Sequence, residues 1–176
     1  MNNNETEKLT NNAFDYSNII PLGQYIAILV QYCETECNKY LQLIKEDEER
    51  NEKIKYEYQN YQYGKIYQTS LTITICDKNF KYIECKNAKA FNEAIQNKQV
   101  NNVKSLTIEL NICFKRGQNE NIKDHNNEFI LQFEPYEITF TRKSNFNDIA
   151  MNQIENNINE LLKKFPKVDT IFCTKE

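Results

Sequence analysis

The stretch S-L-T-I-E-L-N-I-C-F-K, residues 105–115, has the most regular alternation of apolar and polar side chains in the sequence. A repeat of two residues is typical of a β-strand that buries one of its faces in a hydrophobic core. The expected buried set is Leu106, Ile108, Leu110, Ile112 and Phe114, and the expected outward set is Thr107, Glu109, Asn111, Cys113 and Lys115. The pattern therefore predicts a half-buried strand.

A hairpin and a short helix are predicted before this strand. Residues 71–76 alternate in the same way, D-K-N at 77–79 is typical of a turn, and F-K-Y-I-E-C at 80–85 returns as the second strand. Asn87 is a suitable N-cap for the helix that follows. Its expected apolar face consists of Ala88, Phe91 and either Ala94 or Ile95.

After a polar loop at residues 117–127, the segment 128–142 changes parity at Pro135. The apolar set is Phe129, Leu131 and Phe133 before the proline, and Tyr136, Ile138 and Phe140 after it. Because proline lacks an N–H group, it favours an edge position or a bulge. The segment is therefore either one bulged edge strand or two strands joined by a sharp corner.

The chain is predicted to close with a helix and a short strand. Ser144 or Asn147 can cap the helix, and Pro166 ends it. The expected apolar side consists of Phe146, Ala150, Ile154, Ile158, Leu161 and Phe165. V-D-T-I-F-C, residues 168–173, is then expected to form a last short strand.

A long helix is predicted near the N-terminus, with Asn18 as N-cap and Pro21 in its first turn. Its apolar stripe is Leu22, Ile26, Leu29, Cys33, Cys37, Tyr40 and Ile44, and residues 45–53 then have no apolar face. A helix over residues 18–58 would be roughly 60 Å long at about 1.5 Å per residue. Such a length favours a coiled coil or a dimer.

Taken together, the elements predict an α+β fold with the order α-ββ-α-β-β-α-β. The sheet is expected to be mostly antiparallel, with the helices packed on one face. The domain organisation is a disordered polar tail at 1–17, the long helix at 18–58 and the α+β domain at 59–176.

The composition narrows the class of partner and the compartment. The net charge is −3 and the sequence pI is about 5.4, so the chain lacks the positive field that concentrates nucleic acid. The N-terminal residues are too polar for a signal peptide, and the six cysteines are expected to be free thiols. The longest apolar run, residues 19–30, is too short to span a bilayer. We expect an intracellular protein, cytoplasmic or nuclear, with no membrane partner.

Cys33 and Cys37 are the first candidate site, because a spacing of four residues places both thiols on one side of a helix. A structural zinc site needs four ligands, usually with a second close pair. The other cysteines, Cys76, Cys85, Cys113 and Cys173, are isolated in the sequence. Since Cys33 and Cys37 continue the apolar stripe, burial is favoured over metal binding or redox chemistry. Glu34 and Glu36 are then expected to face water.

Cys113 and His125 are a second candidate, for a thiol enzyme. Cys113 is on the polar side of its strand, and His125 is the one histidine of the chain. A nucleophilic cysteine needs such a base within hydrogen-bond reach. The competing interpretation is an ordinary exposed or covered cysteine.

Glu84 and Lys86, in the strand end I-E-C-K, are a third candidate. This short segment resembles the core of the PD-(D/E)xK nucleases, which implies carboxylates that hold Mg²⁺ beside a lysine. The second acid would be Asp77. If 77–79 is the turn, about seven residues of strand separate Asp77 from Glu84 by roughly 20 Å. Ligands of one metal lie much closer, and the expected neighbour of Glu84 is Thr72.

Tyr56, Tyr58, Tyr61 and Tyr63 form a fourth candidate, next to Lys53, Lys55 and Lys65. Tyrosines with lysines can stack the bases of single-stranded nucleic acid. They are also enriched at protein interfaces. Glu52 and Glu57 in the same segment, and the acidic balance of the chain, favour the protein interface.

No motif carries a complete catalytic or cofactor site, and none is expected to need a cofactor. The preferred hypothesis is a non-catalytic interaction or assembly module. It would engage a protein partner, and also itself as a homo-oligomer, through the long helix and the sheet surface. A metal-dependent nuclease or thiol enzyme is the alternative, and a single-stranded nucleic-acid-binding accessory protein is the third hypothesis.

Overall fold

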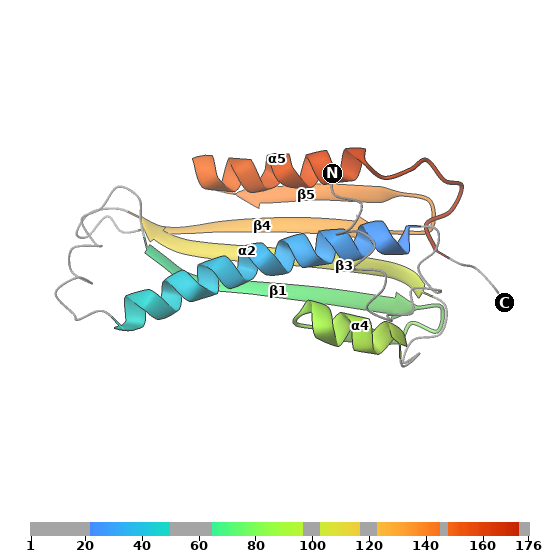
Figure 1. Ribbon diagram of the computed structural model, residues 1–176, viewed down its shortest axis with the longest axis horizontal. Coiled ribbons are helices and arrows are strands. Elements are labelled where there is room, and N and C mark those ends of the chain that lie inside the picture. The colour runs from blue at the N-terminus through green and yellow to red at the C-terminus, as the bar shows by residue number, and fades with distance from the viewer. Residues whose placement is uncertain (1–21, 50–64, 97–102, 117–122, 145–147, 173–176) are drawn as a thin grey trace.

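The computed structural model describes residues 22–49, 65–96, 103–116, 123–144 and 148–172 (Figure 1). The predicted tail at 1–17, the four tyrosines at 56–63 and the helix beyond residue 49 lie outside the described residues. The elements are α2 (Gly23–Glu49), β1 (Lys65–Asp77), β2 (Tyr82–Cys85), α4 (Ala88–Gln96), β3 (Val103–Arg116), β4 (Lys123–Phe133), β5 (Ile138–Ser144) and α5 (Ile149–Lys163).

The five strands form one antiparallel sheet in the order β2-β1-β3-β4-β5. The alternating stretch that predicted a strand is β3, the middle strand. Its register pairs Leu110 with Leu71 of β1 and with Phe129 of β4, so these side chains share one face. All three are buried in the core. The predicted fold class, α+β with a mostly antiparallel sheet, is confirmed.

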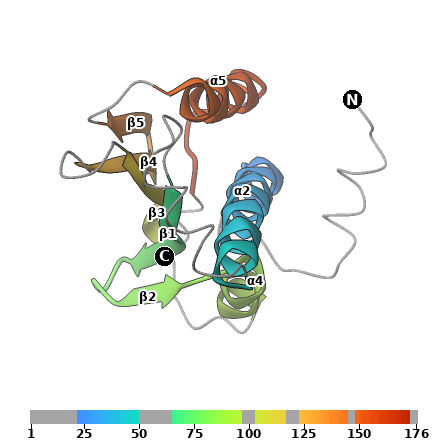
Figure 2. The ribbon, with the colours of Figure 1, turned by 90° about the vertical axis from the view of Figure 1, so that its left-hand side faces the viewer.

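The helices α2, α4 and α5 lie on the same side of the sheet (Figure 2), as predicted. The stripe of α2 from Leu22 to Tyr40 is buried against the sheet, whereas Leu41 and Leu43 are exposed. On the opposite face, which we call the open face, Thr72, Thr74 and Thr107 are half-buried. No described helix has the length and apolar character needed to cross a bilayer.

Pro135 marks a corner between two strands, which was the second of the two predicted alternatives. Phe133 pairs with Ile138, and the Glu134 N–H donates to the Glu137 carbonyl at 2.9 Å. Tyr136 is therefore carried out of the sheet and is 82% exposed, so its predicted place in the apolar set was wrong. Proline suits this position because a turn fixes φ near its preferred value and needs no N–H there.

Two other predicted boundaries were wrong. Residues 123–127 belong to β4 and not to a loop, because β3 continues to pair as far as Arg116 with Lys123. Within the described part of 168–173 there is no strand. Ile171 and Phe172 are buried there, and the Ile171 N–H donates to the Pro135 carbonyl at 2.8 Å. This segment thus binds the β4–β5 corner and fills the core.

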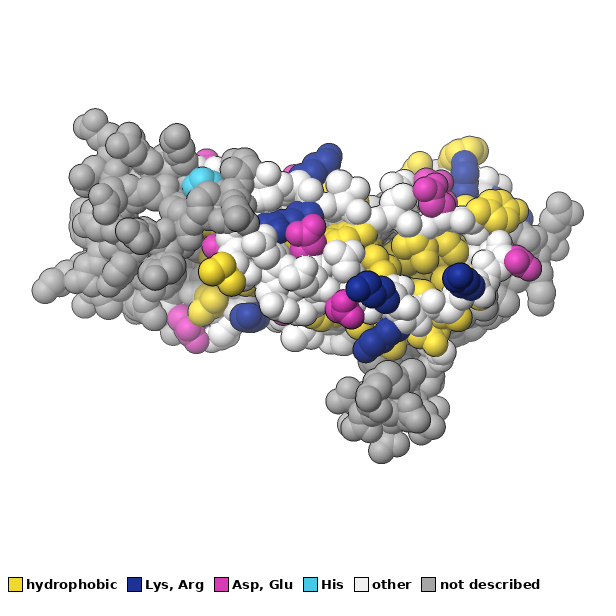
Figure 3. Space-filling model, turned by 90° about the horizontal axis from the view of Figure 1, so that it is seen from above, with side chains coloured by type: hydrophobic (Ala, Val, Ile, Leu, Met, Phe, Trp, Pro, Cys, Tyr) yellow, Lys and Arg dark blue, Asp and Glu magenta, His cyan; other side chains and the backbone are white. Residues whose placement is uncertain are grey.

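Helix α5 is capped by Asp148, whose side chain accepts from the Met151 N–H at 3.1 Å. The predicted cap Ser144 lies in β5. The buried stripe is Met151, Ile154 and Ile158, so it begins three residues before Ile154, and the predicted Ala150 is exposed. Seen from the side of α5 and β5, apolar side chains occupy the middle of the surface, with charged ones around them (Figure 3).

Helix α4 has the predicted N-cap and buried face. The Asn87 side chain accepts from the Ala90 N–H at 2.7 Å. Glu34 of α2 also accepts a hydrogen bond, from the Ala88 N–H. The expectation that Glu34 and Glu36 face water was therefore wrong: Glu34 supplies an acceptor to a helix N-terminus, and the Glu36 side chain is only 15% exposed.

Candidate functional site

The β1–β2 hairpin is organised by Asp77, the last residue of β1. Its backbone N–H donates to the Lys81 carbonyl and its carbonyl accepts from the Phe80 N–H, both at 3.0 Å. Its side-chain Oδ1 accepts from the N–H groups of Asn79 and Lys81, both at 2.9 Å. The Asp77 side chain is buried. Four hydrogen bonds to one residue therefore hold the three loop residues 78–80 in a single shape.

Phe80 is the third residue of this loop and has a φ of 60°, the one non-glycine residue with positive φ in the described part of the chain. Three-residue hairpin loops commonly end with a residue in this left-handed region, where glycine is favoured. A residue with a Cβ atom costs roughly 1–2 kcal/mol there. The Phe80 side chain is also 64% exposed, so it contributes little burial in return.

Tyr82 follows Phe80 by two residues and is 65% exposed. It pairs with Cys76, and Cys76 also pairs with Ser105, which places Tyr82 on the open face. A hydrogen bond between the side chains of Tyr82 and Cys76 raises the pKa of the Tyr82 phenol. Cys76 is buried although it lies on the open face. Tyr82 is thus an exposed aromatic side chain next to a buried thiol.

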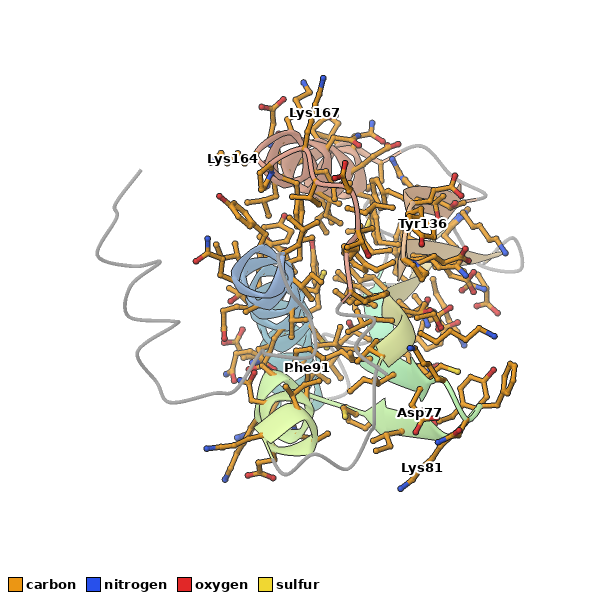
Figure 4. All side chains as sticks on the ribbon, turned by 90° about the vertical axis from the view of Figure 1, so that its right-hand side faces the viewer. Asp77, Lys81, Phe91, Tyr136, Lys164 and Lys167 are labelled. Carbon is orange, nitrogen blue, oxygen red and sulfur yellow. The ribbon has the colours of Figure 1, made fainter. Side chains whose placement is uncertain are left out.

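One lysine contacts the Phe80 ring, and two more lie in the same hairpin. The Lys104 Nζ lies 3.8 Å from the centroid of the Phe80 ring, a cation–π distance. Lys78 lies in the hairpin loop and Lys81 directly follows it, and both are exposed, as is Lys104. We name Phe80, Tyr82, Lys78, Lys81 and Lys104 the aromatic–lysine patch. In Figure 4, Asp77 and Lys81 lie at one edge of the sheet and Tyr136 lies towards the other.

One feature of the sequence indicates this patch: a phenylalanine at the last position of the hairpin loop. The turn was placed at residues 77–79, whereas the hairpin closes between Asp77 and Lys81, so the loop is 78–80. With that loop length, the third position calls for glycine or asparagine. A phenylalanine at such a position is visible in the sequence, but only once the pairing of the two strands is known.

Cys33 and Cys37 are both buried in the core, as the packing interpretation predicted. Burial raises the pKa of the Cys33 thiol to about 12 and also raises that of Cys37. The Thr69 hydroxyl lies 3.8 Å from the Cys37 Sγ atom, within hydrogen-bond reach of sulfur. Among the described residues, no group of three or more His, Cys, Asp and Glu side chains is arranged to hold a metal ion.

We expect native-state thiol labelling to reach Cys113 first, because it is the one half-exposed cysteine among those described. The experiment uses a Cys173→Ser background, since Cys173 lies outside the described residues. Cys33, Cys37, Cys76 and Cys85 are buried and should react only when the protein opens, at least about 100-fold more slowly. Mass spectrometry after timed alkylation reads each site, and Cys113→Ser should remove the fast phase. Rapid labelling of Cys33 and Cys37 would contradict their placement in the core.

Cys113 and His125 are not brought together as a catalytic pair. Cys113 pairs with Asn126 across β3 and β4, whereas His125 pairs with Phe114. Directly paired residues share a face and successive residues alternate, so the two side chains lie on opposite faces of the sheet. The His125 ring contacts Phe114, with 5.6 Å between the ring centroids. Burial raises the pKa of the Cys113 thiol, and the carboxylates of Glu128 and Asp124 add to this.

Glu84 and Lys86 form a surface ion pair, with 2.5 Å between the Glu84 Oε1 and the Lys86 Nζ. Asp77, the second acid of the nuclease hypothesis, lies at the other end of β2, where its Oδ1 is used by two loop N–H groups. Glu84 pairs with Thr74 and not with the predicted Thr72, because the hairpin closes at Asp77 and Lys81. The structure therefore does not assemble two carboxylates and a lysine here.

Comparison with known proteins gives no match: no family model, no curated protein and no solved structure is similar to this chain. Tyr56, Tyr58, Tyr61 and Tyr63 lie outside the described residues, so their predicted role stays a prediction. The aromatic–lysine patch combines two exposed aromatic rings with a lysine held against one of them, as a binding surface does.

Proposed function

We propose that the protein is a non-catalytic interaction module that contacts a protein partner through the aromatic–lysine patch. The observation that carries the proposal is Phe80, which combines a φ of 60° with 64% exposure. Glycine would suit the backbone better, and a polar residue would suit the solvent better. The side chain is therefore explained by a contact outside the chain, where a buried aromatic ring contributes strongly to binding.

The patch is held in one geometry before any partner arrives. The bonds of Asp77 fix the backbone of the loop, and the Lys104 ammonium lies against the Phe80 ring. A side chain that is already ordered loses less conformational entropy on binding. Rigid aromatic anchors surrounded by polar groups are the usual centre of a protein–protein interface.

The open face of the sheet extends the patch with a polar surround. Beside Tyr82, the face carries Thr74 and Thr107, which are paired with each other across β1 and β3. Both are half-buried and uncharged. Hydroxyl groups of this kind suit the hydrogen-bonding rim of an interface.

A second surface suits self-association. Helix α2 continues beyond Tyr40, the last buried side chain among residues 23–46, and exposes Leu41 and Leu43. Exposed aliphatic side chains on a helix can pack against a second helix, and these two, being two residues apart, lie on different sides of α2. We include a homo-oligomer in the proposal, with this end of α2 as its contact.

The enzyme alternatives have less support than the interaction module. Asp77 is not brought to the Glu84–Lys86 pair. Cys113 and His125 lie on opposite faces of the sheet.

The experiment compares three versions of the full chain as baits in native lysate. These are the wild type, the double variant Phe80→Gly/Tyr82→Ser, and the control Tyr136→Ser, which removes an aromatic ring that is even more exposed, from the β4–β5 corner. We expect a specific partner to be captured by the wild type and the control and to fall at least about tenfold with the double variant. Light scattering of the same proteins shows whether the partner is a second copy.

The variant at Phe80 is not expected to destabilise the protein. Phe80→Gly relieves the left-handed strain, so the free energy of unfolding should stay equal or rise by about 0.5–1 kcal/mol. Urea unfolding of the double variant itself then shows whether lost capture results from unfolding. If all three baits capture the same proteins in the same amounts, the patch is not the site of the interaction.

A further inference from the structure

The charge of the aromatic–lysine patch selects among protein partners. Lys104 lies against the Phe80 ring, and Lys78 and Lys81 are exposed in the same hairpin. Of the carboxylates in the same hairpin, Asp77 is buried and bonded to loop N–H groups, and Glu84 is paired with Lys86. The outer surface of the patch is therefore positive, although the chain as a whole has a net charge of −3.

We infer that the patch binds an acidic segment of a protein partner in which an apolar side chain lies beside Asp or Glu. This inference rests on the proposed function. The apolar side chain packs on Phe80 and Tyr82, and the carboxylates accept hydrogen bonds from the lysines around them. Lys104 joins the two requirements, because its ammonium lies 3.8 Å from the Phe80 ring centroid. A carboxylate bound to Lys104 thus brings its neighbouring side chain onto the ring.

Single-stranded nucleic acid offers a related chemistry, since it combines negative charge with stacking bases. The observations favour the acidic protein segment. A nucleic-acid groove follows the backbone over several nucleotides with a run of positive charge. Here Tyr82 is followed on the same strand face by Glu84, and the open face continues with uncharged threonines. The test below therefore includes a single-stranded DNA probe, whose binding would indicate nucleic acid instead.

The test measures fluorescence anisotropy of labelled probes with the full chain. The first probe is a short peptide rich in Asp and Glu that contains Leu and Phe. The second replaces each acid by Lys, the third replaces Leu and Phe by Ser, and the fourth is an oligothymidine strand. The proteins are the wild type, Phe80→Gly, Lys104→Glu and the control Lys143→Glu, which makes the same charge change on β5 at the far edge of the sheet.

The first probe should bind the wild type, and its affinity should fall at least about tenfold with Phe80→Gly and with Lys104→Glu. Lys143→Glu should change it by less than about twofold, because that charge is distant and screened. Binding should weaken between about 0.01 and 0.1 M ionic strength, as the screening length shortens from roughly 30 to 10 Å. The second and third probes should bind clearly more weakly.

Three results would overturn the inference: no binding of the first probe, equal binding of the lysine peptide, or tight binding of oligothymidine alone, which would assign the patch to nucleic acid. These results are separable from failure of the proposed function. If capture in lysate depends on Phe80 and Tyr82 while the acidic probe fails, the partner is a protein of another chemistry. If capture is independent of both residues, the interaction site itself is wrong.

Discussion

Replacing Arg142 by alanine is expected to lower the free energy of unfolding by about 2–3 kcal/mol, because a buried amide loses its donor and a partly exposed carboxylate loses its counter-charge. The Arg142 side chain is only 10% exposed although it lies on the edge strand β5. Its Nη1 lies 2.5 Å from Asn152 Oδ1 and 2.9 Å from Glu155 Oε2, and its Nη2 lies 3.3 Å from Asn127 Oδ1. One side chain therefore joins β5 to β4 and to α5.

The cost arises from the groups that remain after truncation. Asn127 is fully buried and loses a donor, and the Glu155 carboxylate loses its counter-charge. The guanidinium also covers the Phe129 ring, at 5.6 Å from its centroid. Urea unfolding followed by circular dichroism measures the change. Lys143→Ala, the next residue on the opposite face, is the matched control and should stay within about 0.5 kcal/mol of the wild type.

A double replacement separates lost charge pairing from lost packing. Arg142→Met with Glu155→Met removes both charges and keeps apolar volume, so it should recover much of the stability lost in Arg142→Ala. An inward-pointing charge on an edge strand also discourages pairing with other chains, and the double variant should aggregate more readily. If Arg142→Ala unfolds within about 1 kcal/mol of the wild type, Arg142 does not hold this junction together.

Asp77→Ala is the second large effect, with an expected loss of about 2 kcal/mol in the free energy of unfolding. The change removes the acceptor of two backbone N–H groups, those of Asn79 and Lys81, at a buried position. Leaving such donors without an acceptor costs roughly 1–3 kcal/mol each when water cannot replace it. Water can reach the exposed side of the loop, so each of the two donors should cost only about 1 kcal/mol, or about 2 kcal/mol together.

Asp77→Asn tests the hydrogen bonds directly, because its amide oxygen can replace Oδ1 as the acceptor. It should retain most of the stability, and Lys78→Ala in the same loop should change it by less than about 0.5 kcal/mol. Thermal and urea unfolding both report the difference. Asp77→Asn as damaging as Asp77→Ala would show that the negative charge, and not the acceptor, organises the loop.

Periodicity alone was sufficient for the fold class. The repeat of two residues in 105–115 located the middle strand and its buried face, and the spacing of three and four in α2 located the stripe from Leu22 to Tyr40. Both patterns are local consequences of backbone geometry, so a single sequence displays them. The same reasoning identified Cys33 and Cys37 as core residues before any contact was known.

The wrong predictions concern side chains whose exposure or orientation depends on a residue that is distant in the sequence. Glu34 was expected in water, but it accepts from the N–H of Ala88 on another helix. Cys113 and His125 are close in sequence, but the register of β3 with β4 places them on opposite faces. Alternation puts Arg142 on the face of Ile138 and Phe140, yet its burial depends on Asn127 and Glu155 from two other elements.

The sequence by itself determined the fold class, the buried face of each main element and the packing role of the helix cysteines. These follow from hydrophobic periodicity, which is written into consecutive residues. Only the tertiary structure decided the loop length that places Phe80 at positive φ, the grouping of Phe80 with Tyr82 and Lys104, and the burial of Arg142. The physical reason is that strand register and side-chain pairing depend on contacts between distant segments, which a single sequence does not specify.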